Sequence, residues 1–101
     1  MAICLVVDNV DESREEFESV MKQLGQSGPI PPTGASLLVA GAAEDRWRVI
    51  SNWDSPESLQ RFFGERLAPA YKDAGLSLDN VRRSTFEVHT LVVEGGGAQG
   101  A

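Results

Sequence analysis

The only histidine of the chain, His89, is the side chain best suited to proton transfer. It lies beside Glu87 and Leu91 in a segment of alternating polar and apolar residues near the C-terminus. An imidazole has an ordinary pKa of about 6.5 and can act as a general base near neutral pH. A histidine on a strand is more often a buried or interfacial hydrogen-bonding group. His89 is therefore a candidate catalytic residue, with a structural role as the alternative.

The composition argues against a metal site and against a nucleophilic catalytic triad. One histidine and one cysteine, Cys4, cannot form a thiolate zinc cluster or a metalloprotease helix. No serine motif marks a partner for His89 in a catalytic triad. The triplet Gly95-Gly96-Gly97 has no helix behind it to present N–H groups to a phosphate. We therefore expect no metal and no cofactor.

Length and charge narrow the class of protein. The 101 residues, 42% of them hydrophobic, suffice for one domain. The net charge of -6, from 15 acidic and 9 basic residues, opposes binding to nucleic acid. The apolar start of the chain has no basic leader and reaches Asp8 too early for a signal peptide or a membrane span. Because a single free thiol suits a reducing compartment, we expect a cytoplasmic location. Because no segment suits a membrane span, we expect no membrane partner.

A strand followed by a capped helix is the clearest structural signal. From Arg46 to Trp53, successive side chains point to opposite faces of an extended segment. Asn52 and Trp53 therefore cannot line one cavity unless a bulge intervenes. Ser55 suits the N-cap and Pro56 the first position of the helix that follows.

The same periodicities predict two helices and four strands. The helices run from about Glu12 to Leu24, capped by Asp11 or Ser13 and closed by Gly25, and from Pro56 to Ala74. Since Pro69 lacks an N–H group, the second helix should kink or restart near Ala68. The strands are expected at Ile3–Val7, Ala35–Ala42, Arg46–Trp53 and Arg83–Glu94.

This order of elements predicts an α+β, ferredoxin-like βαββαβ fold, with two helices on one face of a four-stranded antiparallel sheet. One domain would span residues 1–94, and residues 95–101 would form a flexible Gly-rich tail. The first two strands are apolar on both sides, so the uncovered face of the sheet would be a large apolar patch. We therefore predict a homodimer in which two sheets associate face to face.

The sequence also resembles a known family. The segments Trp47-Arg48-Val49-Ile50, Trp53-Asp54-Ser55, Phe62-Phe63-Gly64-Glu65-Arg66-Leu67-Ala68-Pro69 and Ala74-Gly75-Leu76 are similar to the dimeric α+β barrel superfamily. Within it, the chain resembles small proteins of the antibiotic biosynthesis monooxygenase type. The resemblance covers about Ile3 to Val93. It implies the dimeric α+β barrel fold, but the fold alone does not select one of the several activities found on it.

Cofactor-free oxygenases of this group use Asn, Trp, Tyr and Arg side chains to bind a phenolic substrate, assist its deprotonation and hold its oxyanion. By this resemblance, Asn52 and Tyr71 join His89 as expected catalytic residues. The expected substrate-binding residues are Arg48, Trp53, Phe62 and Phe63. Structural roles are the alternatives: Trp53 in the core beneath the helices and Arg48 in a surface or dimer salt bridge.

Two functions remain open. The first is a small-molecule-binding homodimer, acting as a cofactor-free monooxygenase or isomerase on an apolar, aromatic or polyketide-type substrate. The second is a non-catalytic dimer whose barrel is filled by its own side chains. A cavity of about 300 Å³ or more with convergent polar groups would favour the first. Haem degradation is a weaker third hypothesis, because relatives of that kind need a histidine on the second helix and this chain has none there.

Overall fold

The computed structural model describes residues 1–10, 13–79, 81–93 and 97–100. The elements in chain order are β1 (Ile3–Asn9), α1 (Arg14–Ser27), β2 (Ala35–Ala43), β3 (Arg46–Trp53), α2 (Pro56–Phe62), the π-helical turn η1 (Phe63–Leu67), α3 (Ala68–Asp73), β4 (Val81–Glu87), β5 (Thr90–Val93) and β6 (Gly97–Gly100).

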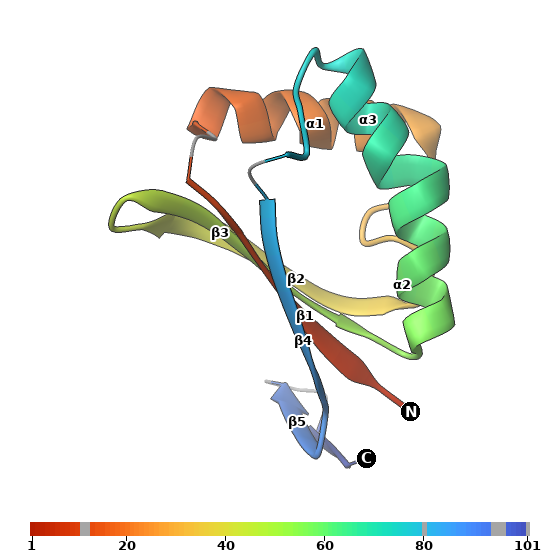
Figure 1. The fold of residues 1–101 in the computed structure, drawn as a ribbon. Coiled ribbons are helices and arrows are strands. Elements are labelled where there is room, and N and C mark those ends of the chain that lie inside the picture. The colour runs from red at the N-terminus through yellow and green to blue at the C-terminus, as the bar shows by residue number, and fades with distance from the viewer. Residues whose placement is uncertain (11–12, 80, 94–96, 101) are drawn as a thin grey trace.

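Four strands form one antiparallel sheet in the order β2-β3-β1-β4, and β5 and β6 form a separate two-stranded sheet. Helices α1, α2 and α3 lie on one side of the larger sheet, so no helix of the described residues covers its other face (Figure 1). The ferredoxin-like α+β fold predicted from the order of elements is confirmed.

Helix α1 is longer than predicted. Ser13 caps it with a full capping box, in which the Ser13 hydroxyl accepts from the Glu16 N–H and the Glu16 carboxylate accepts from the Ser13 N–H. The helix does not end at Gly25 but continues to Ser27. Its end is stabilised by the Arg66 guanidinium, which donates to the Leu24 carbonyl at 2.7 Å. The expected start at Glu12 and the alternative cap Asp11 lie outside the described residues.

The second helix breaks where Pro69 predicts. Helix α2 ends at Phe62, five residues form the π-helical turn η1, and α3 restarts at Ala68. Because Pro69 has no N–H group, a regular α-helix would leave the carbonyl four residues earlier without a donor. In η1 the Ala68 N–H donates instead to the Phe63 carbonyl.

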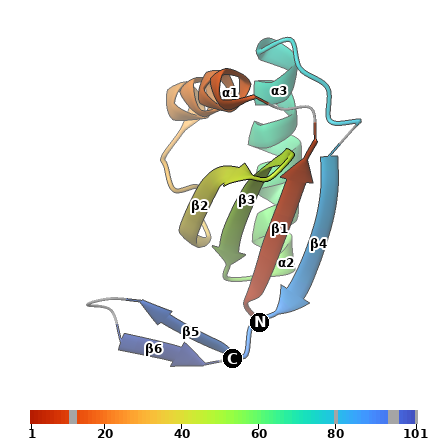
Figure 2. The ribbon, with the colours of Figure 1, turned by 90° about the vertical axis from the view of Figure 1, so that its left-hand side faces the viewer.

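The last predicted strand is wrong in extent. Instead of one strand from Arg83 to Glu94, β4 ends at Glu87 and β5 begins at Thr90. At the break Val88 is buried and donates its N–H to the Ala2 carbonyl at 2.9 Å, which continues the pairing of β4 with β1 by one residue. Beyond this bond the chain leaves the sheet and pairs with residues 97–100 (Figure 2). Of the predicted tail, residues 95, 96 and 101 lie outside the described residues, and its flexibility stays a prediction.

The core lies between the sheet and the helices. It contains Ile3 and Leu5 of β1, Val20 and Leu24 of α1, Trp53 of β3, Phe62 of α2, and Ala70 and Tyr71 of α3. Trp53 is only 1% exposed. This layer is therefore where a buried ligand of this subunit would have to fit.

Candidate functional site

Strand register divides the predicted site residues between the two faces of the sheet. In β3, Trp53 packs in the layer beneath the helices, with its ring 5.0 Å from that of Phe62. Its neighbour Asn52 is also buried, and its amide donates to the Ser36 hydroxyl at 2.7 Å. Since neighbouring side chains of a strand point to opposite faces, Asn52 and Trp53 do not line one cavity of the subunit.

A small apolar cavity lies within the core layer. Its volume is about 60 Å³. The lining residues are Leu5, Val7, Phe17, Val20, Met21, Leu24, Leu38, Val49, Ser51, Trp53, Leu59, Phe62, Leu67 and Tyr71. The Trp53 indole N–H donates to the Ser51 hydroxyl at 2.8 Å, so these two polar groups of the cavity wall are paired with each other.

A larger groove opens beside this cavity, between the edge strand β4 and the α2–η1 segment. It has a volume of about 430 Å³ and is lined by Leu5, Leu59, Gln60, Phe63, Gly64, Arg83, Ser84 and Thr85. Leu5 and Leu59 line both the groove and the inner cavity. These two leucine side chains therefore lie between the two spaces.

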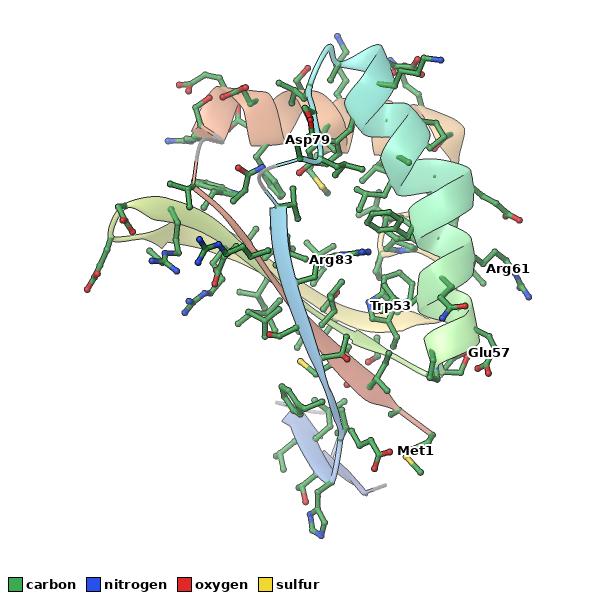
Figure 3. All side chains as sticks on the ribbon, viewed as in Figure 1. Met1, Trp53, Glu57, Arg61, Asp79 and Arg83 are labelled. Carbon is green, nitrogen blue, oxygen red and sulfur yellow. The ribbon has the colours of Figure 1, made fainter. Side chains whose placement is uncertain are left out.

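Arg83 is the charged group of this groove. Its side chain points from β4 toward the helices (Figure 3), and its guanidinium lies over the Phe63 ring, 4.3 Å from the ring centroid. No lining residue is acidic, and none of the ion pairs among the described residues involves Arg83. The groove therefore combines one aromatic ring, two leucines and an arginine that forms no ion pair within the described part of the chain.

Arg48, in contrast, is neutralised within the subunit. Its guanidinium forms two hydrogen bonds with the Asp8 carboxylate, at 2.7 and 3.1 Å. These hydrogen bonds are the main cause of the low pKa of Asp8 and of the raised pKa of Arg48. The pair lies on the open face of the sheet, away from the groove. This position agrees with the structural alternative, in which Arg48 forms a salt bridge rather than binding substrate.

The structure does not bring the three expected catalytic residues together. Tyr71 lines the inner cavity and is 7% exposed. Asn52 lies on the opposite side of the sheet. His89 is exposed at the junction of β4 and β5, where its Nδ1 lies 2.6 Å from the Thr90 hydroxyl. Of the expected substrate-binding residues, Trp53 and Phe62 line the cavity and Phe63 lines the groove.

Sequence reasoning missed Arg83, Leu59 and Gln60 as a group. Leu59 and Gln60 are not among the residues that the sequence analysis singles out, and Arg83 appears there only as the first residue of the expected last strand. A usable signal was present: Arg83, Thr85 and Glu87 alternate with Arg82, Ser84 and Phe86, so one set must face the helices. The register of β4 against β1 determines which set faces the helices. This register cannot be read from the sequence of β4 alone.

A second hollow, of about 290 Å³, lies between α2–η1 and the loop after α1. It is lined by Ser27, Gly28, Pro29, Pro32, Thr33, Ser58, Arg61, Phe62, Glu65 and Arg66. Arg66 donates to the Pro29 carbonyl at 2.9 Å as well as to Leu24, and its guanidinium lies 5.7 Å from the Phe62 ring centroid. Arg66 therefore holds the loop and two helical segments together.

Neither a metal site nor a membrane span is found in the part of the chain that the structure describes. No three His, Cys, Asp or Glu side chains there are grouped so that they could hold a metal ion. None of the helices formed by these residues is long and apolar enough to cross a bilayer.

Comparison with known proteins supports the fold. No protein-family model matches the chain, and no curated protein matches it in sequence. SnoaB, a cofactor-independent oxygenase from Streptomyces nogalater, superposes with a TM-score of 0.62 at 15% identity, over 90% of this chain and 96% of its own. A dimeric ferredoxin-like protein of unknown function from Jannaschia sp. CCS1 superposes with a TM-score of 0.60 at 12% identity, over 87% of this chain and 100% of its own.

A third solved structure is a candidate antibiotic biosynthesis monooxygenase from Deinococcus radiodurans. It superposes with a TM-score of 0.57 at 12% identity, over 92% of this chain and 97% of its own. At these identities the likeness concerns the fold. The predicted resemblance to the antibiotic biosynthesis monooxygenase type of ferredoxin-like protein is confirmed at that level.

Proposed function

We propose that this protein is a homodimer that binds a planar aromatic anion in the groove between β4 and α2–η1, and that it acts on this ligand as a cofactor-independent monooxygenase. The observation that carries the proposal is the Arg83 guanidinium lying 4.3 Å above the Phe63 ring in a groove without an acidic lining residue. The names of two structural neighbours, a cofactor-independent oxygenase and a dimeric protein, support the activity and the assembly.

Size decides between the inner cavity and the adjoining groove beside Arg83 as the place where a ligand would bind. An engineered apolar cavity of about 150 Å³ binds benzene, and typical ligand sites measure about 300–1,000 Å³. The inner cavity of about 60 Å³ is too small for one ring. The groove of about 430 Å³ is large enough for a fused aromatic system. The ligand would therefore occupy the groove, with Leu5 and Leu59 as its floor.

Arg83 can supply the chemistry that such a reaction requires from the protein. A guanidinium next to a phenolic oxygen favours the ionised form and lowers the pKa of the phenol. The resulting phenolate is electron-rich and is the species that reacts with dioxygen. The apolar side chains of Phe63, Leu5 and Leu59 would exclude water and so strengthen this electrostatic stabilisation. In this proposal Trp53, Phe62 and Tyr71 support the floor of the site from the core.

The alternative function, a non-catalytic dimer with a filled barrel, has its own supporting observation. The cavity found in the core layer of the described residues measures only about 60 Å³, and the Trp53 indole N–H in its wall is paired with Ser51. If the groove is an ordinary surface depression, the protein would bind no aromatic ligand there and would serve only assembly.

Binding measurements with a charged and a neutral probe test the proposal. We expect 2-naphthoate to bind wild-type protein more tightly than 2-naphthamide, because only the carboxylate pairs with Arg83. An interaction with a charged group contributes about 1.5–3 kcal/mol, so Arg83→Gln should weaken binding of 2-naphthoate by about 10- to 150-fold. Binding of 2-naphthamide should change much less.

Arg82→Gln is the matched control, since Arg82 is the neighbouring arginine and lies opposite Asp8 on the open face. It should leave both affinities unchanged. Oxygen consumption with a hydroxyanthrone, measured by electrode, then tests the oxygenase activity. Equal losses of naphthoate binding in both arginine variants, or no binding of either probe, would contradict the proposed site.

A further inference from the structure

Gly64 occupies a helical position that does not require a glycine. It lies in the π-helical turn η1, inside the continuous helical segment from Pro56 to Asp73. Its φ is outside the left-handed region, unlike those of Gly34 and Gly75. Outside its own helix backbone, a Cβ at Gly64 would meet no atom of the described residues within 4 Å. Because glycine destabilises a helix interior relative to alanine, another reason for this residue must be sought.

Gly64 lines the groove beside Arg83. Residues four apart on a helix lie on the same side, so Gln60 and Gly64 form one row along the groove. Leu59 and Phe63 form the neighbouring row and are half-buried. Gln60 and Gly64 are exposed. The row of Gln60 and Gly64 is therefore the outer wall of the groove, nearer to solvent than its leucine floor.

Strand β4 forms the opposite wall of the groove. Register pairs Thr85 with Leu5, which lies in the core beneath the helices. Since alternate residues of a strand share a face, Arg83 and Thr85 both face the helices. Figure 3 shows the Arg83 side chain in this direction, and its guanidinium lies over Phe63, the residue next to Gly64. The absence of a side chain at Gly64 thus leaves space close to the cation that would bind the ligand.

We infer that Gly64 sets the breadth of the aromatic system that the groove admits beside Arg83. This inference rests on the proposed ligand site and adds a residue that selects among its ligands. A side chain at position 64 would project into the groove, because the residue lines the groove and a Cβ there meets nothing else. Helical π-turns are frequent at functional sites, and Phe63 and Gly64 begin the turn η1.

Two aromatic carboxylates of different breadth test this role. 2-Naphthoate has two fused rings and pyrene-1-carboxylate has four, and both carry the carboxylate that pairs with Arg83. Gly64→Leu should weaken binding of pyrene-1-carboxylate by about tenfold or more, since two or more ring carbons would lose their contact with the groove. Binding of 2-naphthoate should weaken less than about threefold in the same fluorescence titration. Gly64→Ala should change the selectivity in the same direction by a smaller factor.

Gly25→Leu is the matched control. Gly25 is also an exposed glycine within a helix, α1, and a Cβ there would likewise meet nothing within 4 Å. It does not line the groove, so its substitution should leave the affinities for both carboxylates unchanged. Circular dichroism and urea unfolding check that each variant remains folded, which leucine favours at both positions because it is a better helix former than glycine.

Equal losses for the two carboxylates in Gly64→Leu would overturn the inference, because Gly64 would then not select by breadth. Unchanged affinities in this variant would overturn it as well. The ligand site is tested separately by Arg83→Gln with the same two carboxylates. Loss of binding in Arg83→Gln with unchanged selectivity in Gly64→Leu would refute only the role of Gly64. No binding of either carboxylate by the wild-type chain would refute the ligand site itself.

Discussion

Leu59 offers a test in which stability and binding should change in opposite directions. Its side chain is half-buried and lines both the groove of about 430 Å³ and the inner cavity of about 60 Å³. Leu59→Ala would remove the atoms that separate the two spaces on the helix side. The free energy of unfolding should therefore fall, while a planar ligand should be able to reach further into the core.

The magnitudes follow from the buried area. Truncation of leucine to alanine removes three carbon groups, one methine and two methyls, each contributing about 0.8 kcal/mol when fully buried. For a half-buried side chain we expect unfolding to become easier by about 1–2 kcal/mol, below the 2–5 kcal/mol of fully buried leucines. If two further ring carbons of the ligand become buried, binding should tighten by about 1–2 kcal/mol, a factor of about 5–30.

Leu67→Ala is the matched control. Leu67 is also half-buried and lines the inner cavity, but not the groove. It should cost similar stability in urea unfolding and leave the affinity for 2-naphthoate in a calorimetric titration unchanged. If Leu67→Ala tightens binding as much as Leu59→Ala, or if Leu59→Ala weakens binding while the protein remains folded, the groove is not continuous with the cavity through Leu59.

Three further predictions concern the scaffold. Trp53→Ala should lower the free energy of unfolding by about 3–5 kcal/mol in urea, because this side chain is 1% exposed, and Trp47→Ala, at a half-buried position, should lower it less. Gly34→Ala should lower the free energy of unfolding by about 1–3 kcal/mol, because Gly34 has φ +93° and a Cβ would lie 2.7 Å from the Ser58 Cβ. Gly41→Ala is the control, because a Cβ there would meet nothing within 4 Å. Asp8 has a pKa below its ordinary 3.8, so its ionised form stabilises the folded state above about pH 4, and this contribution is lost as the pH falls through the lowered pKa. The difference in urea midpoint between wild type and Asp8→Asn should therefore shrink from pH 7 to pH 3, and an unchanged difference would contradict the ion pair.

Much of the fold was predictable because the type of several elements depends on residues that are neighbours in the sequence. The alternation along β3, the Ser55–Pro56 cap and the restart after Pro69 all depend on neighbouring residues, and all appear as predicted. The end of α1 was mispredicted because its last turn is stabilised by Arg66, 42 residues away from Leu24 in the sequence. A glycine is a stop signal only where no distant side chain satisfies the last carbonyls.

The candidate site was less predictable for a related reason. A groove forms between elements, and its lining depends on which strand becomes the edge and which of its faces meets a helix. Phe63 is expected at the substrate site only through the family resemblance, and Leu59 is not expected there, because a residue of a groove wall and a residue of the core show the same helical spacing. Arg48 and Arg83 are both arginines on strands, yet register pairs the first with Asp8 and places the second over Phe63. Only the three-dimensional pairing distinguishes a neutralised arginine from an available one.

The proposed ligand site and the proposed homodimer share one physical cause. Helices α1 to α3 cover one face of a four-stranded sheet, and the α2–η1 segment runs along β4 without closing against it. The groove beside Arg83 and the bare face beyond β1 are thus both surfaces that this layer of helices leaves uncovered. Among the described residues no helix covers the bare face, and the groove stays open between β4 and α2–η1. A ligand for the first and a second copy for the second would each bury apolar surface that the chain leaves exposed, which is why ligand binding and assembly can be tested separately.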